Sequence, residues 1–162
     1  MDERTAFLEG MSRVNGPVTI VTAAGDDGPA GMTVSAMCSV SADPPSVLVC
    51  GQRDVPATTA IEIAGAFNVN VLATDDQYLS DVFGDRTDVK EPERFSVGQW
   101  ETGANGAPRL STAIAVFECR LERRETWHSH EVLIGVVEQT HLSDSKPPLA
   151  YVLRRYATPS LL

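Results

Sequence analysis

A chain of 162 residues with 43% hydrophobic and 22% charged residues can bury a core and has an ordinary globular composition, so we expect one domain over residues 1–162. The formal net charge of −9 argues against a nucleic-acid-binding surface, which would need clustered lysine and arginine. The N-terminus lacks the basic start and apolar run of a signal peptide, and no apolar stretch approaches the roughly 20 residues of a membrane span. We therefore expect a cytoplasmic protein without a membrane partner.

Hydrophobic periodicity predicts the elements of the first half of the chain. In chain order they are an amphipathic helix over 3–14, a buried strand over 18–24, a turn at 25–29, a strand from residue 30 to the rigid corner Asp43-Pro44-Pro45, and an apolar strand over 47–50. Next come a helix with apolar positions Ala57, Ala60, Ile61 and Ala64, an alternating strand over 66–72, and a helix carrying Tyr78, Leu79, Val82 and Phe83, which Thr74 and Asp75 can cap.

The second half begins with a connection that is long for a compact domain. Residues 84–109 are rich in glycine, proline and charge, with Phe95 and Trp100 as isolated anchors, so this segment is a candidate lid or partner contact. Three strands follow, a half-exposed one over 115–122 and two more over 131–140 and 149–156. Six or more strands with about three short helices in mixed order predict an antiparallel barrel closed by hairpins, with helices at its ends.

Several kinds of chemistry find no support in the residue pattern. No serine lies in a G-x-S-x-G frame, no cysteine has a recognisable histidine context, and no Rossmann or P-loop glycine motif occurs. The three cysteines, Cys38, Cys50 and Cys119, lie in apolar runs, and we expect small buried hydrophobic residues in a reducing compartment. His128 and His130 would share one face of a strand and could reach one metal ion. A third ligand is missing locally, with His141 and Glu131 as the possibilities, so we expect no metal site; one histidine would then be exposed while the other lines a pocket.

Residues 30–51 are the best candidate for a binding surface. Hydroxyl side chains alternate with apolar ones, and the two prolines of the corner leave the preceding N–H groups of Ser39, Val40 and Ser41 free to bind an acceptor. The alternative is an inert, solvated edge strand. A phosphate or a hydrogen-bonding ring would suit the donors.

The chain resembles the flavin reductase family, the small partners of two-component flavin-dependent monooxygenases. The resemblance begins with G-M-T-V-S-A-M-C-S-V-S-A-D-P-P-S-V-L-V-C and covers nearly the whole chain in order. Its later segments are A-T-T-A-I-E-I-A-G-A-F-N-V-N-V-L-A (57–73), L-S-D-V-F-G (79–84), R-F (94–95), the Trp100 region, G-A-P-R-L (106–110), F-E-C-R-L (117–121), H-E-V-L-I-G-V-V (130–137) and P-L-A-Y (148–151).

The resemblance implies an FMN-binding split β-barrel, mainly β with short helices and usually a homodimer. It implies binding of FMN or FAD, oxidation of NADH or NADPH, and transfer of the reduced flavin to a separate oxygenase. Two departures bear on the site. The family commonly has Gly-Asp before the histidine that matches His130, where this chain has His128-Ser129, and it often has Asn where this chain has Val34 or Ser35. The choice between FMN and FAD therefore stays open.

The resemblance also implies roles for individual residues. The isoalloxazine ring would be wrapped by Met32, Thr33, Val34, Ser35 and Ala36, and the ring and ribityl side lined by Ser39, Val40 and Ser41. The phosphate would be held by Cys50, Gly51, Gln52, Arg53 and Thr58. Phe83 would pack near the flavin or the nicotinamide, His130 would contact the nicotinamide, and Tyr156 would lie near the dimer seam.

Two other functions remain compatible with the sequence. Split barrels can hold flavin or haem as carriers or sensors without nicotinamide turnover. Barrels that resemble pyridoxamine-phosphate oxidase use their flavin to oxidise a small substrate directly. The choice between NADH and NADPH also stays open, because Arg53, Arg86 or Arg94 could meet a 2′-phosphate, whereas exposed arginines are usually only solvated.

Overall fold

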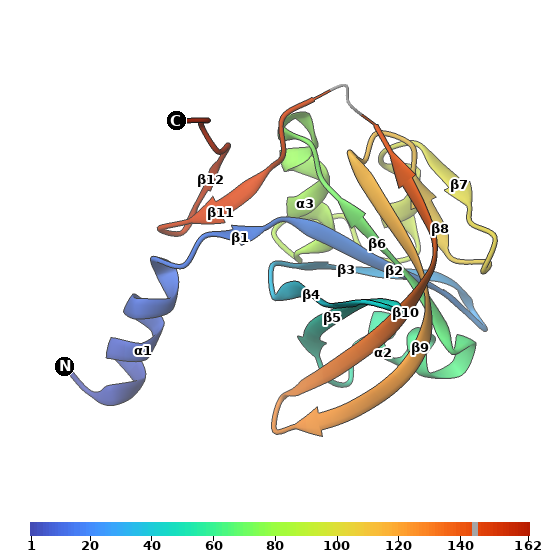
Figure 1. Cartoon of the computed structure of the whole chain (residues 1–162), viewed down its shortest axis with the longest axis horizontal. Coiled ribbons are helices and arrows are strands. Elements are labelled where there is room, and N and C mark those ends of the chain that lie inside the picture. Colours follow the sequence, from blue (N-terminus) through green and yellow to red (C-terminus); the bar gives the residue numbers. More distant parts are fainter. Residues whose placement is uncertain (144–145) are drawn as a thin grey trace.

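The computed structural model describes residues 1–143 and 146–162, and strands dominate it (Figure 1). The helices are α1 (Glu3–Ser12), α2 (Pro56–Ala64) and α3 (Gln77–Phe83), with 3₁₀ turns at Thr74–Asp76 and Glu93–Ser96. The strands are β1 (Gly16–Pro17), β2 (Thr19–Gly25), β3 (Gly28–Val34), β4 (Met37–Ala42), β5 (Pro45–Gln52), β6 (Ala66–Val71), β7 (Trp100–Thr102), β8 (Pro108–Leu110), β9 (Ala115–Trp127), β10 (His130–Leu142), β11 (Ala150–Val152) and β12 (Arg155–Ala157).

Seven strands form one antiparallel sheet in the order β3-β2-β6-β9-β10-β5-β4. The sheet curls around on itself (Figure 1), and β3 and β4 are its two edge strands, joined directly by Ser35 and Ala36. Two smaller sheets, β1-β11-β12 and β7-β8, flank it. The predicted antiparallel split barrel is thus confirmed, and it brings β3 close to the junction between β5 and α2.

Two apolar clusters fill the barrel and its upper end. One packs Ile61 and neighbouring residues of α2 against the sheet, where Phe67, Val49 and Leu133 are at most 1% exposed. Pro56 suits the first turn of α2, and Gly65 ends it in the left-handed region at φ 63°. The other cluster packs α3 against Ile20, Leu72 and Leu149. In Figure 1, α3 and α2 therefore lie on opposite sides of the strands that carry the predicted binding residues.

Gly135 shows how closely the strands of the barrel approach one another. A Cβ atom at this position would lie 2.6 Å from the ring of Phe67 and 2.8 Å from the Cβ of Cys119. The pairing of β9 with β10 also shifts register between Ile134 and Gly135. The glycine therefore permits the tight curvature that closes the sheet around Phe67.

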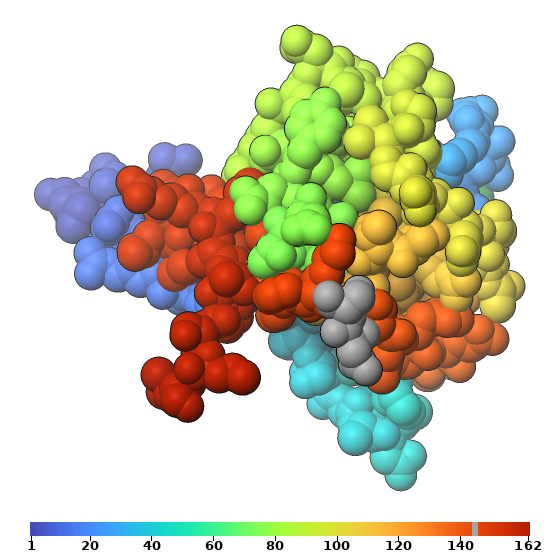
Figure 2. Space-filling view, turned by 90° about the horizontal axis from the view of Figure 1, so that it is seen from above, coloured from blue at the N-terminus to red at the C-terminus, as the bar shows by residue number. Residues whose placement is uncertain are grey.

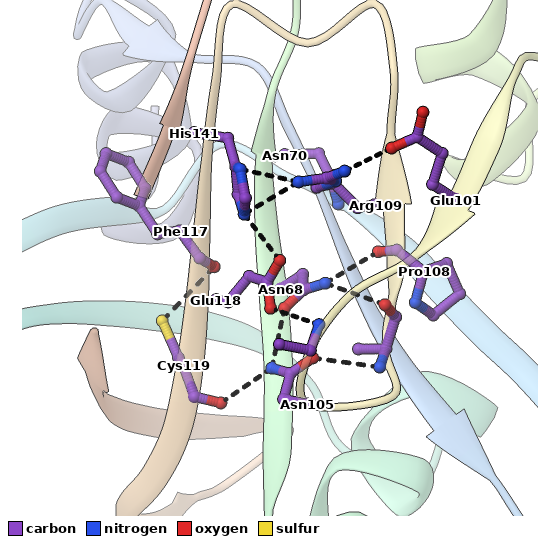
Figure 3. A network of polar contacts seen from close by, with 12 residues as sticks. Asn68, Asn70, Glu101, Asn105, Pro108, Arg109, Phe117, Glu118, Cys119 and His141 are labelled. Atoms are coloured by element: carbon purple, nitrogen blue, oxygen red, sulfur yellow. Dashed lines mark hydrogen bonds and ion pairs between the residues drawn. The ribbon is translucent and has the colours of Figure 1, made fainter. Parts of the chain in front are cut away.

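A buried polar network fixes the β7–β8 hairpin to the sheet (Figure 3). Glu118 of β9 is only 2% exposed; its Oε1 lies 2.8 Å from Nε2 of His141, and its Oε2 accepts the Ala104 N–H at 2.8 Å. Asn68 of β6 donates to the Ala107 carbonyl at 3.0 Å, and Asn70 accepts the Leu110 N–H at 2.8 Å. Because a buried polar group without a partner is costly, these side chains dictate the path of residues 104–110.

The structure corrects four sequence expectations. The helix predicted over 3–14 is present, but no residue of α1 is buried, and Phe7 is 61% exposed. Cys38 is exposed, not buried as expected. The strand predicted over 149–156 is a hairpin of two short strands, because Leu153 and Arg154 adopt positive φ. The N-cap residue of α3 is Asp76, not Thr74 or Asp75; it makes no side-chain cap bond to α3, and its Oδ2 instead accepts the Ala73 N–H at 3.1 Å.

The surface view shows which parts project from the barrel (Figure 2). The blue N-terminal helix and the dark red C-terminal end project from the rest, and the cyan segment around residues 40–50 protrudes on another side. Among the described residues, no helix combines the length and apolar character needed to cross a bilayer.

The long β9–β10 hairpin is held at its outer end by a buried carboxylate. Glu131 is 0% exposed and receives two hydrogen bonds from Arg124, from Nε at 3.0 Å and from Nη2 at 3.1 Å. The Thr126 hydroxyl lies 3.1 Å from Oε2 of the same carboxylate. The hydrogen bonds from Arg124, aided by Thr126, hold the pKa of Glu131 below its ordinary value of 4.5.

This lowered pKa predicts the pH dependence of one stability difference. Glu131 stabilises the fold above its unfolded-state pKa, and this contribution disappears as pH falls through the lower folded-state value. Glu131→Gln should therefore lower the free energy of unfolding most near neutral pH, and the difference from the wild type should shrink below about pH 4.5. Urea unfolding at a series of pH values measures this. A difference that stays constant down to pH 3 would contradict it, and Glu125→Gln, at an exposed position of the same hairpin, is the control.

Candidate functional site

A cavity of about 750 Å³ opens between β3, the β5–α2 junction, α3 and the start of β10. This volume lies within the usual range of small-molecule and cofactor sites. The residues that line it are Gly31–Ala36, Cys50–Gln52, Val55–Ala57, Phe83–Asp85, Glu91, Arg94 and His130, together with Phe7 and Met11 of α1. Five segments distant in sequence thus meet at one concave site.

Ten of the residues predicted for the site line this one cavity. They are Met32, Thr33, Val34, Ser35, Ala36, Cys50, Gly51, Gln52, Phe83 and His130. Strand pairing explains the position of His130, because its register partner on β5 is Gln52. The main-chain N–H of Arg53 also donates to the Ser129 carbonyl at 3.0 Å, which fixes the hairpin turn next to the end of β5.

Six other predicted residues do not line the cavity. Ser39, Val40 and Ser41 are exposed on the edge strand β4, and Tyr156 donates its hydroxyl to Asp81 at 2.6 Å beside α3. Arg53 is 46% exposed and pairs with Asp54, while the Thr58 hydroxyl is occupied by the Val55 carbonyl at 3.0 Å. None of these six residues is part of the cavity lining.

Thr33 and the start of α2 supply polar groups to the cavity lining. The Thr33 hydroxyl donates to the Ser80 carbonyl at 2.7 Å, so its oxygen remains an acceptor while its proton is used. Val55, Pro56 and Ala57 bring the N-terminal end of α2 to the cavity. The unpaired N–H groups and the dipole at a helix N-terminus favour an anion there. A phosphate group therefore suits the α2 end of the cavity.

An aromatic cluster forms the wall on the α3 side. Phe83 contacts Phe95 with ring centroids 5.0 Å apart, and both contact Trp100, at 5.4 Å and 5.1 Å. A Cβ at Gly31 would lie 2.8 Å from the Phe83 ring, so the glycine lets β3 pack flat against it. The two residues expected to be isolated anchors thus contact each other and support Phe83, and Asp85, Glu91 and Arg94 of the predicted lid segment line the cavity.

Three charged residues that the sequence hypothesis did not place in the site also line this wall. They are Asp85, Glu91 and Arg94. The hydrogen bond from Lys90 and the charge of Arg94 hold the pKa of Asp85 below its ordinary value, so it is an anion at neutral pH. The sequence left Arg94 either as a contact for a 2′-phosphate or as a solvated arginine, but its side chain is only 9% exposed. No periodic pattern marks these residues, although the R-F pair at 94–95 belongs to the resemblance.

The histidines do not form a metal centre. His128 lies in the hairpin turn at φ 50°, and His130 lines the cavity with its Nδ1 2.9 Å from the Ser129 hydroxyl. His141 belongs to the Glu118 network, and Glu131 is paired with Arg124. No group of three potential ligands occurs among residues 1–143 and 146–162.

Comparison with known proteins gives one consistent answer. Residues 11–160 match the family model described as the flavin reductase like domain. The FMN reductase (NADH) RutF of Cronobacter sakazakii is 38% identical over 156 residues, which are 96% of this chain and 93% of that protein.

Two solved structures share the fold over almost their full length. BorF, the flavin reductase component of a bacterial two-component tryptophan halogenase, is 31% identical with a TM-score of 0.86, covering 96% of this chain and 98% of that one. The NADH:FAD oxidoreductase SgcE6 of Streptomyces globisporus C-1027, in complex with NAD and FAD fragments, is 25% identical with a TM-score of 0.88, covering 98% and 93%. The chain therefore belongs to the flavin reductase family.

Proposed function

We propose that this protein catalyses hydride transfer from NADH to FMN. The observation that carries the proposal is the single cavity that unites the β3 segment 31–36, the β5–α2 junction and His130. The curated relative RutF is named as an FMN reductase that uses NADH, which supports this pair of substrates. SgcE6 is named for FAD, so FAD and NADPH are the comparison substrates in the tests below.

The residues of the cavity fit a flavin and a nicotinamide. A bound flavin supplies the hydride-accepting chemistry, and the protein has to hold two rings at near-contact distance. The volume of about 750 Å³ accommodates aromatic rings, and its lining combines apolar side chains with main-chain groups of Met32 to Ala36. The α2 N-terminus would receive the phosphate. No protein acid or base is required for this reaction, which agrees with the absence of a nucleophile motif in the sequence.

The direct test is to mix purified protein with each flavin and each nicotinamide. We expect quenching of FMN fluorescence on binding and oxidation of NADH, measured at the nicotinamide absorbance band, in the presence of FMN. FMN binding without consumption of NADH or NADPH would contradict the proposal and favour a carrier or sensor. Substrate-dependent bleaching of the flavin without any nicotinamide would favour a direct oxidase.

His130 provides a second test, because it lines the cavity on an exposed strand end where a nicotinamide could reach it. His130→Ala should raise the KM for NADH about three- to tenfold, the loss expected for one hydrogen bond or ring contact, and leave the FMN Kd within twofold. His128→Ala is the matched control, because His128 is equally exposed but lies in the turn. Unchanged kinetics in His130→Ala would remove this residue from the site.

We further propose that the reduced flavin passes to a separate flavin-dependent oxygenase. BorF belongs to a two-component halogenase, and the reductase SMOB of Pseudomonas putida S12 belongs to styrene monooxygenase. Those names describe the relatives. They support a transfer role here because the proposed reaction yields a reduced flavin, which such an oxygenase would consume.

We also propose a homodimer, because α1 leaves an apolar face uncovered beside the edge strand β4. Leu8 and Met11 of this face, and Val14 just beyond the helix, are 46–56% exposed and border a second cavity of about 590 Å³ next to Met37 and Leu48. Gel filtration with light scattering should give twice the mass of the single chain, and Leu8→Glu should shift it toward the monomer because it places a charge on the apolar face. Arg4→Glu, on an exposed residue of the same helix, is the control. A monomer at micromolar concentration would contradict the proposal.

A further inference from the structure

Arg94 is a buried cation with most of its hydrogen-bonding groups unused. Its side chain is 9% exposed, and it borders the cavity. Nη2 donates to Asp85, whereas Nη1 lies 3.8 Å from Glu91 Oε1, beyond hydrogen-bond distance. Nε is buried and has no partner among the described residues. Two of the three guanidinium nitrogens therefore lack a hydrogen bond within that part of the chain.

Such an arrangement is costly unless a ligand completes it. A guanidinium offers five N–H donors in a rigid plane, and leaving buried donors unpaired forfeits the hydrogen bonds that water would supply. Structural arginines in protein interiors are normally saturated by carboxylates and carbonyls. The Nη1 group of Arg94 instead remains available at the wall of the same cavity that holds the proposed flavin and nicotinamide, whereas Nε is buried away from it.

Glu91 places an acceptor beside these donors. Its side chain is 22% exposed, and Oε1 accepts the Gly31 N–H at 3.3 Å, which positions the carboxylate against β3. Oε2 has no hydrogen bond among the described residues. Donor and acceptor groups thus lie side by side on one wall, with Asp85 completing the cluster.

The charge of this wall decides which kind of ligand it suits. Asp85, Glu91 and Arg94 line it, and Lys90, just outside the lining, pairs with Asp85 at 3.1 Å, so two carboxylates are balanced by two cations. The wall therefore has no excess positive charge that would attract a phosphate. A neutral group that offers a carbonyl oxygen next to an N–H would satisfy both Arg94 and Glu91 at once.

We propose that Arg94 and Glu91 form a subsite for an amide group, with Arg94 donating to its C=O and Glu91 accepting from its N–H. The inference rests on the proposed function, which brings two such groups to the cavity: the pyrimidine edge of the flavin and the carboxamide of the nicotinamide. Arg94 then selects the ring system of one substrate and does not bind a 2′-phosphate.

Variants of the wall test the subsite and identify its ligand. Arg94→Gln should weaken binding of one substrate about 10- to 100-fold, the usual cost of losing a hydrogen bond to a charged group, and leave the other within twofold. The Kd for FMN is measured by fluorescence quenching without turnover, and the Kd for NADH by its own fluorescence. A weaker FMN Kd assigns the subsite to the flavin edge, and a weaker NADH Kd assigns it to the carboxamide.

Two further variants separate this role from packing or general charge. Lys90→Gln removes the other cation that pairs with Asp85. Because Lys90 lies outside the cavity lining, both Kd values should stay within twofold of the wild type. Arg94→Lys keeps the charge and should still lose affinity, because an ammonium lacks the planar donor set. Equal losses in Lys90→Gln and Arg94→Gln, or full affinity for both substrates in Arg94→Gln, would overturn the proposal.

Ligand analogues test the subsite in the unaltered protein, so the result does not depend on whether a variant folds. FMN methylated at N3 lacks the flavin N–H, and the acetylpyridine analogue of NADH keeps the C=O but lacks the carboxamide N–H. The wild type should bind one of these analogues at least fivefold more weakly than its parent. Parent-like affinity for both would overturn the proposal. If the protein binds FMN but does not oxidise NADH, the reductase proposal fails, while the FMN titrations still test the subsite.

Discussion

The buried carboxylate of Glu118 is the constraint on which the α3 wall of the cavity depends. It can be buried only because His141 and the Ala104 N–H satisfy it, and this requirement fixes the β7–β8 hairpin over β6 and β9. The hairpin begins at Trp100, whose ring supports Phe83 and Phe95. Phe95 directly follows Arg94, so a polar network outside the cavity sets the position of the charged residues within it.

The same network explains the main limit of sequence patterns in this chain. The strands around residues 66–72 and 115–122 are predicted correctly from alternation, because backbone pairing and β propensity act locally. The polar positions of that alternation predict exposure, yet Asn68, Asn70 and Glu118 are buried. Their partners lie in a segment some 15 to 40 residues away, as for Asn70 and the Leu110 N–H. The alternation of apolar and polar residues around a position contains no information about such distant partners.

The residues of the site likewise fall into those that the sequence could place and those that it could not. The β3 segment and His130 could be placed from the sequence through the resemblance, and the structure brings ten of the predicted residues into one cavity. Asp85, Glu91 and Arg94 could not, because they lie in a segment without periodicity, which long-range contacts of Phe95 and Trp100 and the Glu91–Gly31 hydrogen bond hold against β3. The burial of Arg94 likewise arises only when the wall has folded, so the sequence pattern does not predict it.

The two long walls of the cavity differ in what it would cost to displace them. Moving Phe83 would open a void in the upper core, a cost of about 3–5 kcal/mol when a ring is lost entirely. Phe7 and Met11 also line the cavity, but α1 buries none of its residues and is attached near its C-terminal end, where Arg154 pairs with Glu9 at 3.1 Å. One side of the cavity is thus anchored in the core, whereas the α1 side buries no residue of its own. Displacing α1 would therefore open that side of the cavity at little cost in buried apolar surface.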